Sequence, residues 1–452
     1  MLIQPANNLP SPSQEAAQHS ARLVEFIRHD IAARGGWISF ARYMELALYA
    51  PGLGYYTAGA HKFGEAGDFV TAPELSPLFG RTLARQAAEI MARSAPHILE
   101  LGAGSGKLAA DMLGELERLG NLPDSYTILE VSADLRARQQ TLLGERLPHL
   151  MDRVHWLDAL PDQLSGAVIA NEVLDALPVH LVHWRAVDVG RDLSRHGGDV
   201  GINPDLQNRD RAINERGVSI GDNGFIWQDR AIGDAALLHT ARQIAAPNEH
   251  GNDVAPDNET RHARPPHLNP LPQAGEEANE SLREFHINDY VSEICLAAHG
   301  LINSLASRLE QGAMLFIDYG FGAREFYHPQ RDSGTLMCHY RHRAHDDPFF
   351  LPGLQDITAH ANFTAIAECG IDAGLELLGY TSQAFFLINC GIAELMRDTS
   401  PENLRDYLPL SAQLQKLTSP AEMGELFKVI ALGKNMAGPL CGFARGDLSR
   451  SL

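Results

Sequence analysis

The chain lacks features that mark several protein classes. No hydrophobic run approaches the roughly eighteen residues that span a membrane, and the first twenty residues carry no secretory signal pattern. Its five cysteines include no CxxC pair, which argues against a disulfide framework and a zinc site. Basic residues number 37 against 57 acidic ones, a net charge of −20. This balance excludes nucleic-acid binding by phosphate neutralisation and favours a cationic partner. We expect a cytoplasmic protein without a metal ion.

The most informative stretch is a short apolar run that leads into three glycines. Its pattern is E-x-G-x-G-x-G, formed by Glu100, Gly102, Gly104 and Gly106, and it predicts a buried strand ending in a turn where the backbone can approach a ligand. A dinucleotide fingerprint would need a glycine where Lys107 stands. An NAD-dependent oxidoreductase is therefore the least favoured enzyme. The pattern resembles motif I of methyltransferases that use S-adenosyl-L-methionine (SAM).

A second acidic strand end follows the glycine turn. Residues 126–131 read as a strand that ends in Glu130, whose carboxylate could accept hydrogen bonds from both hydroxyls of a ribose. The alternative is a plain strand-to-helix turn with a surface glutamate beyond it. The two motifs together favour a nucleoside-type cofactor more strongly than either does alone.

Short apolar runs alternate with helical patterns from residue 98 onward, which is typical of an α/β fold whose mostly parallel sheet is covered on both faces. Seven strands are predicted, the number in a class I SAM-methyltransferase sheet of Rossmann-like type. Ligands of such sheets bind at the carboxyl ends of the strands. The predicted strands are residues 98–101, 128–131, 154–157, 167–170, 314–317, 384–388 and 427–432.

Roughly 130 residues separate the fourth and fifth predicted strands, far more than one crossover helix needs. We therefore expect a large insertion there, with a small β unit that contains Trp184 and Trp227. Residues 246–279 are rich in Pro, Asn, Glu and Gly, and we expect them to be disordered. The predicted units are an N-terminal helical cap with a cofactor-closing loop (14–92), a methyltransferase domain (93–181 and 283–438) and the insertion (182–282).

Catalytic candidates follow the fourth strand. They are Asn171, Glu172 and Asp175, because in nitrogen methyltransferases this loop faces the methyl group. If the acceptor is a guanidinium, which is always protonated, a pair of carboxylates would orient it and accept the released proton. The alternative is that Asn171 or Asp175 only caps the next helix.

Five ordered motifs resemble the MidA family of SAM-dependent methyltransferases, over about residues 24–434. The motifs are residues 67–76 (GDFVTAPELS), 100–106 (ELGAGSG), 171–178 (NEVLDALP), 317–320 (IDYG), and 334–336 (GTL) followed by 355–360 (QDITAH). Mitochondrial members of this family methylate an arginine of a complex I subunit during assembly.

The resemblance implies roles for individual residues. Residues 67–76 would close over the cofactor, and Asp158 would lie near the adenine amine. The alternative role for Asp356 is that of a plain helix N-cap. The implied cofactor-binding residues are Thr71, Pro73, Glu74, Glu100, Gly102, Gly104, Gly106, Glu130 and Asp158. The implied substrate-binding residues are Asp318, Tyr319, Asp356 and His360.

The chain is therefore expected to be a protein-arginine N-methyltransferase. It would convert SAM to S-adenosyl-L-homocysteine and act on a respiratory-complex subunit or an analogue, as a monomer or homodimer. One alternative keeps the fold and methylates a small-molecule amine or hydroxyl. Another is an assembly factor that binds SAM without catalysis. No nucleic-acid partner and no membrane insertion are expected.

Overall fold

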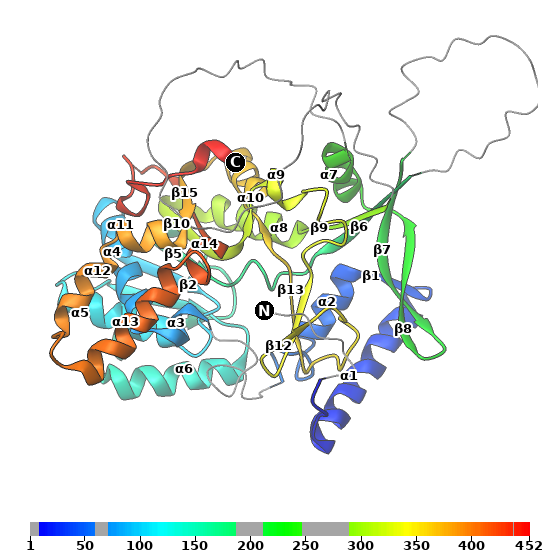
Figure 1. Cartoon of the computed structure of the whole chain (residues 1–452), viewed down its shortest axis with the longest axis horizontal. Coiled ribbons are helices and arrows are strands. Elements are labelled where there is room, and N and C mark those ends of the chain that lie inside the picture. Colours follow the sequence, from blue (N-terminus) through cyan, green and yellow to red (C-terminus); the bar gives the residue numbers. More distant parts are fainter. Residues whose placement is uncertain (1–8, 59–70, 187–210, 246–288, 437) are drawn as a thin grey trace, which may run out of the picture.

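The computed structural model describes residues 9–58, 71–186, 211–245, 289–436 and 438–452. Figure 1 shows two lobes side by side. One lobe is a large sheet with helices on both faces, and the other holds the N-terminal helices and a long β-hairpin. The functional site lies where segments of both lobes meet.

Some predictions fall outside the described residues: residues 67–70 of the predicted closing loop and the whole segment 246–279. Within the described part, no helix combines the length and the apolar character that a membrane crossing requires. The same residues contain no group of three or more His, Cys, Asp or Glu side chains arranged to hold a metal ion.

The large sheet is mixed and has eight strands. Five strands run parallel in the order β10-β5-β2-β3-β4, β16 lies antiparallel between β10 and β15, and the two-residue β14 pairs with β10. The α/β class is as predicted, but β14 is an addition to the seven expected strands. The strands are β2 (His97–Leu101), β3 (Ser125–Leu129), β4 (Val154–Leu157), β5 (Leu164–Asn171), β10 (Leu309–Phe321), β14 (Ala361–Asn362), β15 (Glu376–Ser382) and β16 (Phe427–Lys434).

The strand predicted at residues 384–388 is wrong. This segment is helix α11 (Gln383–Asn389), and the strand at that edge is β15, which precedes it. A short continuous apolar run fits a buried strand and a buried helix equally well. Here Phe386 and Leu387 face the core, whereas Phe385 and Ile388 are exposed, which is the pattern of one helical face.

Alternation along the strands builds two cores. Ile98 and Leu315 face one core with α4 and α5, whereas the next residues, Leu99 and Phe316, face the other core with α8 and α10. The helices are α4 (Pro77–Arg93), α5 (Lys107–Arg118), α6 (Ala133–Arg146), α8 (Leu296–Arg308), α9 (Ala323–Phe326), α10 (Phe363–Asp372), α12 (Ile392–Leu395), α13 (Leu404–Thr418) and α14 (Met423–Leu426), with 3-10 turns η2 (Pro148–Arg153), η4 (Met396–Asp398), η5 (Cys441–Phe443) and η6 (Ser449–Ser451).

The second sheet joins the N-terminal segment to the inserted segment. Its order is β1-β7-β6-β9, and β8 pairs with β7 as the hairpin at the right of Figure 1. Helices α1 and α2 pack on one face of this sheet and α7 packs with the other. The elements are α1 (Gln14–Ala33), β1 (Trp37–Ser39), α2 (Phe40–Tyr49), β6 (His180–Ala186), β7 (Arg211–Gly221), β8 (Gly224–Ala231), α7 (Ala235–Ala245) and β9 (Asp289–Ile294).

Two small elements complete the walls of the site. A three-stranded sheet in the order β12-β11-β13 lies near the N-terminal helices in Figure 1, and the one-turn helix α3 precedes α4. Ile357 of β13 is buried in the same core as residues of α1 and α2, so this sheet is held by the second lobe. The bounds are α3 (Ala72–Leu75), β11 (Met337–Tyr340), β12 (Arg343–His345) and β13 (Asp356–Thr358).

Candidate active site

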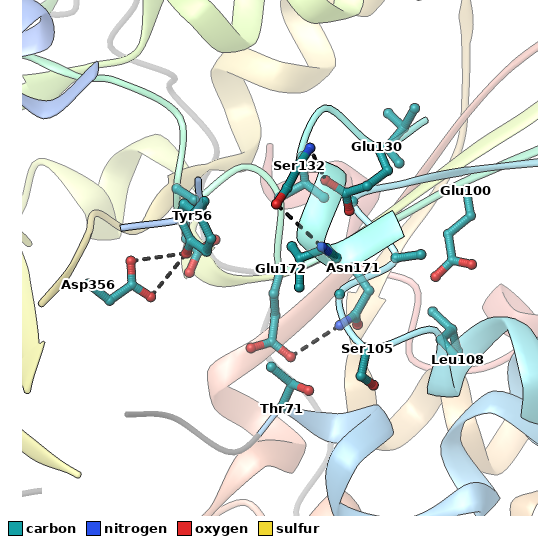
Figure 2. Close-up of a pocket in the computed structure, with 18 of the residues that line it drawn as sticks. Tyr56, Thr71, Glu100, Ser105, Leu108, Glu130, Ser132, Asn171, Glu172 and Asp356 are labelled. Carbon is teal, nitrogen blue, oxygen red and sulfur yellow. Dashed lines mark hydrogen bonds between the residues drawn. The ribbon is translucent and has the colours of Figure 1, made fainter. Parts of the chain in front are cut away.

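A cavity of about 360 Å³ lies beyond the carboxyl ends of β2, β3, β5 and β10, the place where α/β sheets bind ligands. Figure 2 shows part of its lining. Twelve of the sixteen predicted site residues line it: Thr71, Pro73, Glu74, Glu100, Gly102, Gly104, Glu130, Asn171, Glu172, Asp175, Tyr319 and Asp356. The other four, Gly106, Asp158, Asp318 and His360, are not among the lining residues.

The glycine turn forms one wall of the cavity. Gly102 and Gly104 have φ angles of 63° and 54°, in the left-handed region that other residues adopt at a cost. A Cβ atom added to Gly104 would have no protein atom within 4 Å, so it would project into the cavity. Gly106 is required for a different reason: it is the N-cap of α5, and a Cβ there would lie 3.2 Å from Gln139.

Glu100 lies beneath this turn and is 1% exposed. The Tyr126 hydroxyl donates a hydrogen bond to its carboxylate at 2.7 Å. Burial nevertheless raises the pKa of Glu100 to about 7, because removal from water disfavours the charged form. A cation placed in the cavity would favour the ionised form of this carboxyl group.

Glu130 ends the second acidic strand and belongs to a small hydrogen-bond network. Its carboxylate accepts hydrogen bonds from the Ser132 backbone N–H at 2.8 Å and from Gln139 Nε2 at 3.0 Å. Gln139 Nε2 also donates to the Gly104 carbonyl at 2.9 Å. Burial raises the pKa of Glu130. This network couples the acidic strand end to the glycine turn, and Gln139, on α6, was not predicted as a site residue.

The short helix α3 closes one edge of the cavity. Lys107 Nζ donates to the Glu74 carbonyl at 2.8 Å, and the Ser105 hydroxyl donates to the Glu74 carboxylate. Thr71 is the N-cap of α3, and Pro73 lies in its first turn. The contacts of Glu74 therefore attach helix α3 to the glycine turn.

The loop after β5 carries the predicted catalytic residues. Glu172 has a φ of 52°, an uncommon conformation for a residue with a side chain, and such strain concentrates at functional sites. Its backbone N–H donates to the Ile317 carbonyl at 2.8 Å. Its Oε1 accepts from the Ala72 N–H at 3.3 Å and from Asn171 Nδ2 at 3.1 Å. The buried Asn171 Oδ1 has no hydrogen-bond partner.

Burial also acts on the two acids of this loop. It raises the pKa of Glu172 to about 8, and the negative charge of Asp175 adds to the effect. Burial raises the pKa of Asp175 to about 6, although a hydrogen bond with Tyr319 acts in the opposite direction. Two buried acids that repel each other gain from a bound cation, which would favour their ionised forms.

Besides Gly106, three predicted residues lie outside the cavity lining, and local interactions place each of them. Buried Asp318 accepts backbone N–H groups of Leu174 at 2.9 Å and Asp175 at 3.2 Å, so it holds the catalytic loop from below. The Asp158 side chain is 87% exposed and forms an ion pair with Arg136 at 2.5 Å. His360 stacks on Phe321 and lines a separate cavity of about 40 Å³.

Sequence reasoning missed the tyrosines of the wall opposite the glycine turn. Tyr49, Tyr55 and Tyr56 line the cavity, and the Tyr56 hydroxyl lies 3.0 Å from each carboxylate oxygen of Asp356. The only sequence signal was a cluster of three tyrosines within eight positions around Pro51-Gly52. Such a cluster fits a packed core equally well.

The cavity is strongly acidic. Its lining includes six carboxyl groups, and among the described residues that line it there is neither a lysine nor an arginine. In their ionised forms these groups attract cations and repel phosphates. The six residues are Glu74, Glu100, Glu130, Glu172, Asp175 and Asp356.

Comparisons with known proteins show which proteins the chain resembles. A family model described as "Putative S-adenosyl-L-methionine-dependent methyltransferase" matches residues 80–381. A protein from Burkholderia thailandensis, crystallised with S-adenosyl-homocysteine bound, is 45% identical with a TM-score of 0.81, covering 98% of this chain and 100% of that chain. The mitochondrial protein arginine methyltransferase NDUFAF7 of Homo sapiens is 28% identical, covering 88% of this chain and 80% of its own length. The corresponding Danio rerio protein is 27% identical, covering 88% of this chain and 83% of its own length.

The predicted location does not agree with these comparisons. The similar proteins of Danio rerio, Drosophila melanogaster and Homo sapiens are all named as mitochondrial. The prediction of a cytoplasmic protein is therefore contradicted. It rested on the absence of a secretory signal, which says nothing about other cellular addresses.

Proposed function

The chain belongs to the MidA-like family of SAM-dependent methyltransferases, and on that premise we propose that it methylates an arginine side chain of a protein. The observation that carries this proposal is that three carboxyl groups, Glu172, Asp175 and Asp356, line the cavity in addition to those placed beside the cofactor, with no lysine or arginine among the described lining residues. A guanidinium keeps its positive charge at every accessible pH, so it suits such a cavity. The names of the relatives, protein arginine methyltransferases, support the same acceptor.

The glycine turn fits SAM. At Gly104 a Cβ would occupy open space in the cavity, and that space is where we place the methionyl part, with Glu100 beneath it. Glu130 would accept the ribose hydroxyls, and Thr71, Pro73 and Glu74 would border the cofactor. SAM supplies a methyl group on a positively charged sulfur, so catalysis depends mainly on positioning and exclusion of water. Gly106 and Asp158 do not line the cavity. We propose that they contribute to cofactor binding from outside it.

The chain's own residues would orient the acceptor. Glu172 and Asp175 would hold two N–H groups of the guanidinium, and Asn171, which donates to Glu172 at 3.1 Å, would fix the Glu172 side chain. As a guanidinium nitrogen gains its methyl group it loses a proton, and Glu172 would accept that proton and release it to water. Tyr319 would hold Asp175 through their hydrogen bond, and Asp318 would hold the loop backbone.

The resemblance motivates three finer proposals. The protein substrate would be a respiratory-complex subunit or an analogue. Asp356 and His360 would act on the substrate side, with His360 one layer behind the cavity wall. Residues 14–92 would form the cap. Residues 93–181 together with 283–438 would form the methyltransferase domain, and residues 182–282 would form the insertion.

The acceptor can be tested with isotope-labelled SAM. The purified protein is incubated with methyl-labelled SAM and a lysate from cells that lack this chain, and labelled material is digested and analysed by mass spectrometry. We expect label on methylarginine in protein. Label confined to small molecules, or no label while the protein binds SAM, would contradict the proposal and favour one of the two alternatives.

The pH dependence follows from the pKa of Glu172. Because this pKa is raised to about 8, roughly one hundredth of the residue is ionised at pH 6. The ionised form is the one that holds a cation and accepts a proton. We therefore expect kcat/KM to rise with pH between 6 and 8 and to level off above 8. A Glu172→Gln variant should lose the rise above pH 7, where Asp175, with a pKa of about 6, is already ionised; a level wild-type profile would contradict the assignment.

A further inference from the structure

The wall of the cavity opposite the glycine turn is aromatic. The rings of Tyr49 and Tyr56 are stacked, with centroids 5.5 Å apart and planes 24° apart. Both are partly exposed residues that line the cavity, whereas neighbouring Tyr55 is only 3% exposed and packs edge-on against Tyr56. Tyr55 therefore serves mainly as packing, and the surface that Tyr49 and Tyr56 retain belongs to the cavity.

Both rings are held in place by their hydroxyl groups. The Tyr49 hydroxyl donates to the Ala176 carbonyl at 2.9 Å, which ties it to the loop that carries Asp175. The Tyr56 hydroxyl donates to Asp356 on β13, with 3.0 Å to each oxygen. Burial raises the pKa of Tyr56 well above its ordinary value, so the hydroxyl stays a donor at neutral pH. The stack is therefore attached at one end to the catalytic loop and at the other to β13.

Figure 2 shows Tyr56 on one side of Glu172. Tyr56 and Asp356 lie on that side, and Glu100, Glu130 and Ser105 lie on the other. The carboxylate of Glu172 thus lies between an acidic aromatic half of the cavity and the half that contains the glycine turn. An acceptor that enters the aromatic half would present its nitrogen to Glu172.

We propose that Tyr49, Tyr56 and Asp356 form the acceptor subsite, and that the tyrosine stack selects a planar guanidinium over a primary ammonium. This inference rests on the proposed function, which it deepens. A guanidinium is flat and weakly hydrated, and it packs on aromatic faces while it pairs with carboxylates. An ammonium is a compact, strongly hydrated charge, and the rigid stack would not replace its water. Tyr56 acts on the substrate, and Asp356 also positions Tyr56.

The test compares a planar and a compact organic cation, ethylguanidinium and propylammonium, on the full chain loaded with S-adenosyl-homocysteine. Binding is followed by ligand-observed NMR titration. We expect wild-type protein to bind ethylguanidinium about tenfold more tightly than propylammonium, and Tyr56→Leu to lose about that factor for ethylguanidinium alone. Affinity for S-adenosyl-homocysteine should not change. Ile226→Ala, at an exposed position of β8, is the control and should behave as wild type.

A second pair of variants covers the case in which Tyr56→Leu fails to fold. Tyr56→Phe keeps the ring and loses the bond to Asp356, and Asp356→Asn loses the charge; each should weaken ethylguanidinium binding severalfold. Equal affinities of wild-type protein for the two cations, or an unchanged preference in the folded Tyr56 and Asp356 variants, would overturn the inference. Failure of wild-type protein to bind S-adenosyl-homocysteine would instead overturn the proposed function.

Discussion

The substitution Gly104→Val is expected to abolish SAM binding, with a loss of at least a hundredfold in affinity measured by calorimetry. Gly104 has a φ of 54°, and a Cβ there meets no protein atom within 4 Å. The branched side chain would therefore project into the space that the methionyl group needs. Left-handed backbone costs a residue with a side chain about 1–2 kcal/mol, less than the 5–15 kcal/mol by which proteins are typically stable. The variant should remain folded.

Gly120 offers a matched control for the backbone strain. It follows α5 with a φ of 70°, and a Cβ there also meets nothing within 4 Å, but it does not line the cavity. Gly120→Val should therefore lose a similar amount of stability and keep its affinity for SAM. Unchanged affinity in Gly104→Val would remove the glycine turn from the binding site.

The substitution Glu172→Gln should reduce turnover by about a hundredfold to ten-thousandfold, the range associated with loss of a general base. The amide keeps the size of the side chain and an oxygen that can accept from the Ala72 N–H and Asn171 Nδ2. It cannot take up a proton or carry a negative charge. Affinity for SAM should be retained, because the lost interaction acts on the transfer step. Single-turnover kinetics with saturating SAM measure this directly.

The control for this variant is Glu402→Gln, which removes an exposed carboxyl group outside the cavity. It should match wild-type protein in both turnover and SAM affinity. If Glu172→Gln turned over as fast as this control, Glu172 would have no role in proton transfer. A parallel loss of SAM affinity would indicate a disrupted loop, because Glu172 also accepts the Ala72 N–H.

Local patterns predicted the part of the fold that depends on them. Strands buried on both faces appear as short apolar runs, so six of the seven predicted strand segments overlap β2, β3, β4, β5, β10 and β16. The run at 384–388 was ambiguous, because length and composition alone do not separate a short helix from a strand. The pairing of β1 with β7 joins residues 37–39 to residues 217–219, and no local pattern indicates such a long-range contact.

The sequence by itself determined the glycine turn and the acidic strand ends, because the required conformations and charges belong to single positions such as Gly104 and Glu130. Tertiary structure decided which side chains share one cavity. It buried Asp318 beneath the catalytic loop, turned Asp158 to solvent, and set Tyr56 against Asp356, 300 positions away in the chain. The physical reason is that burial and the raised pKa values depend on neighbours that only the folded chain supplies.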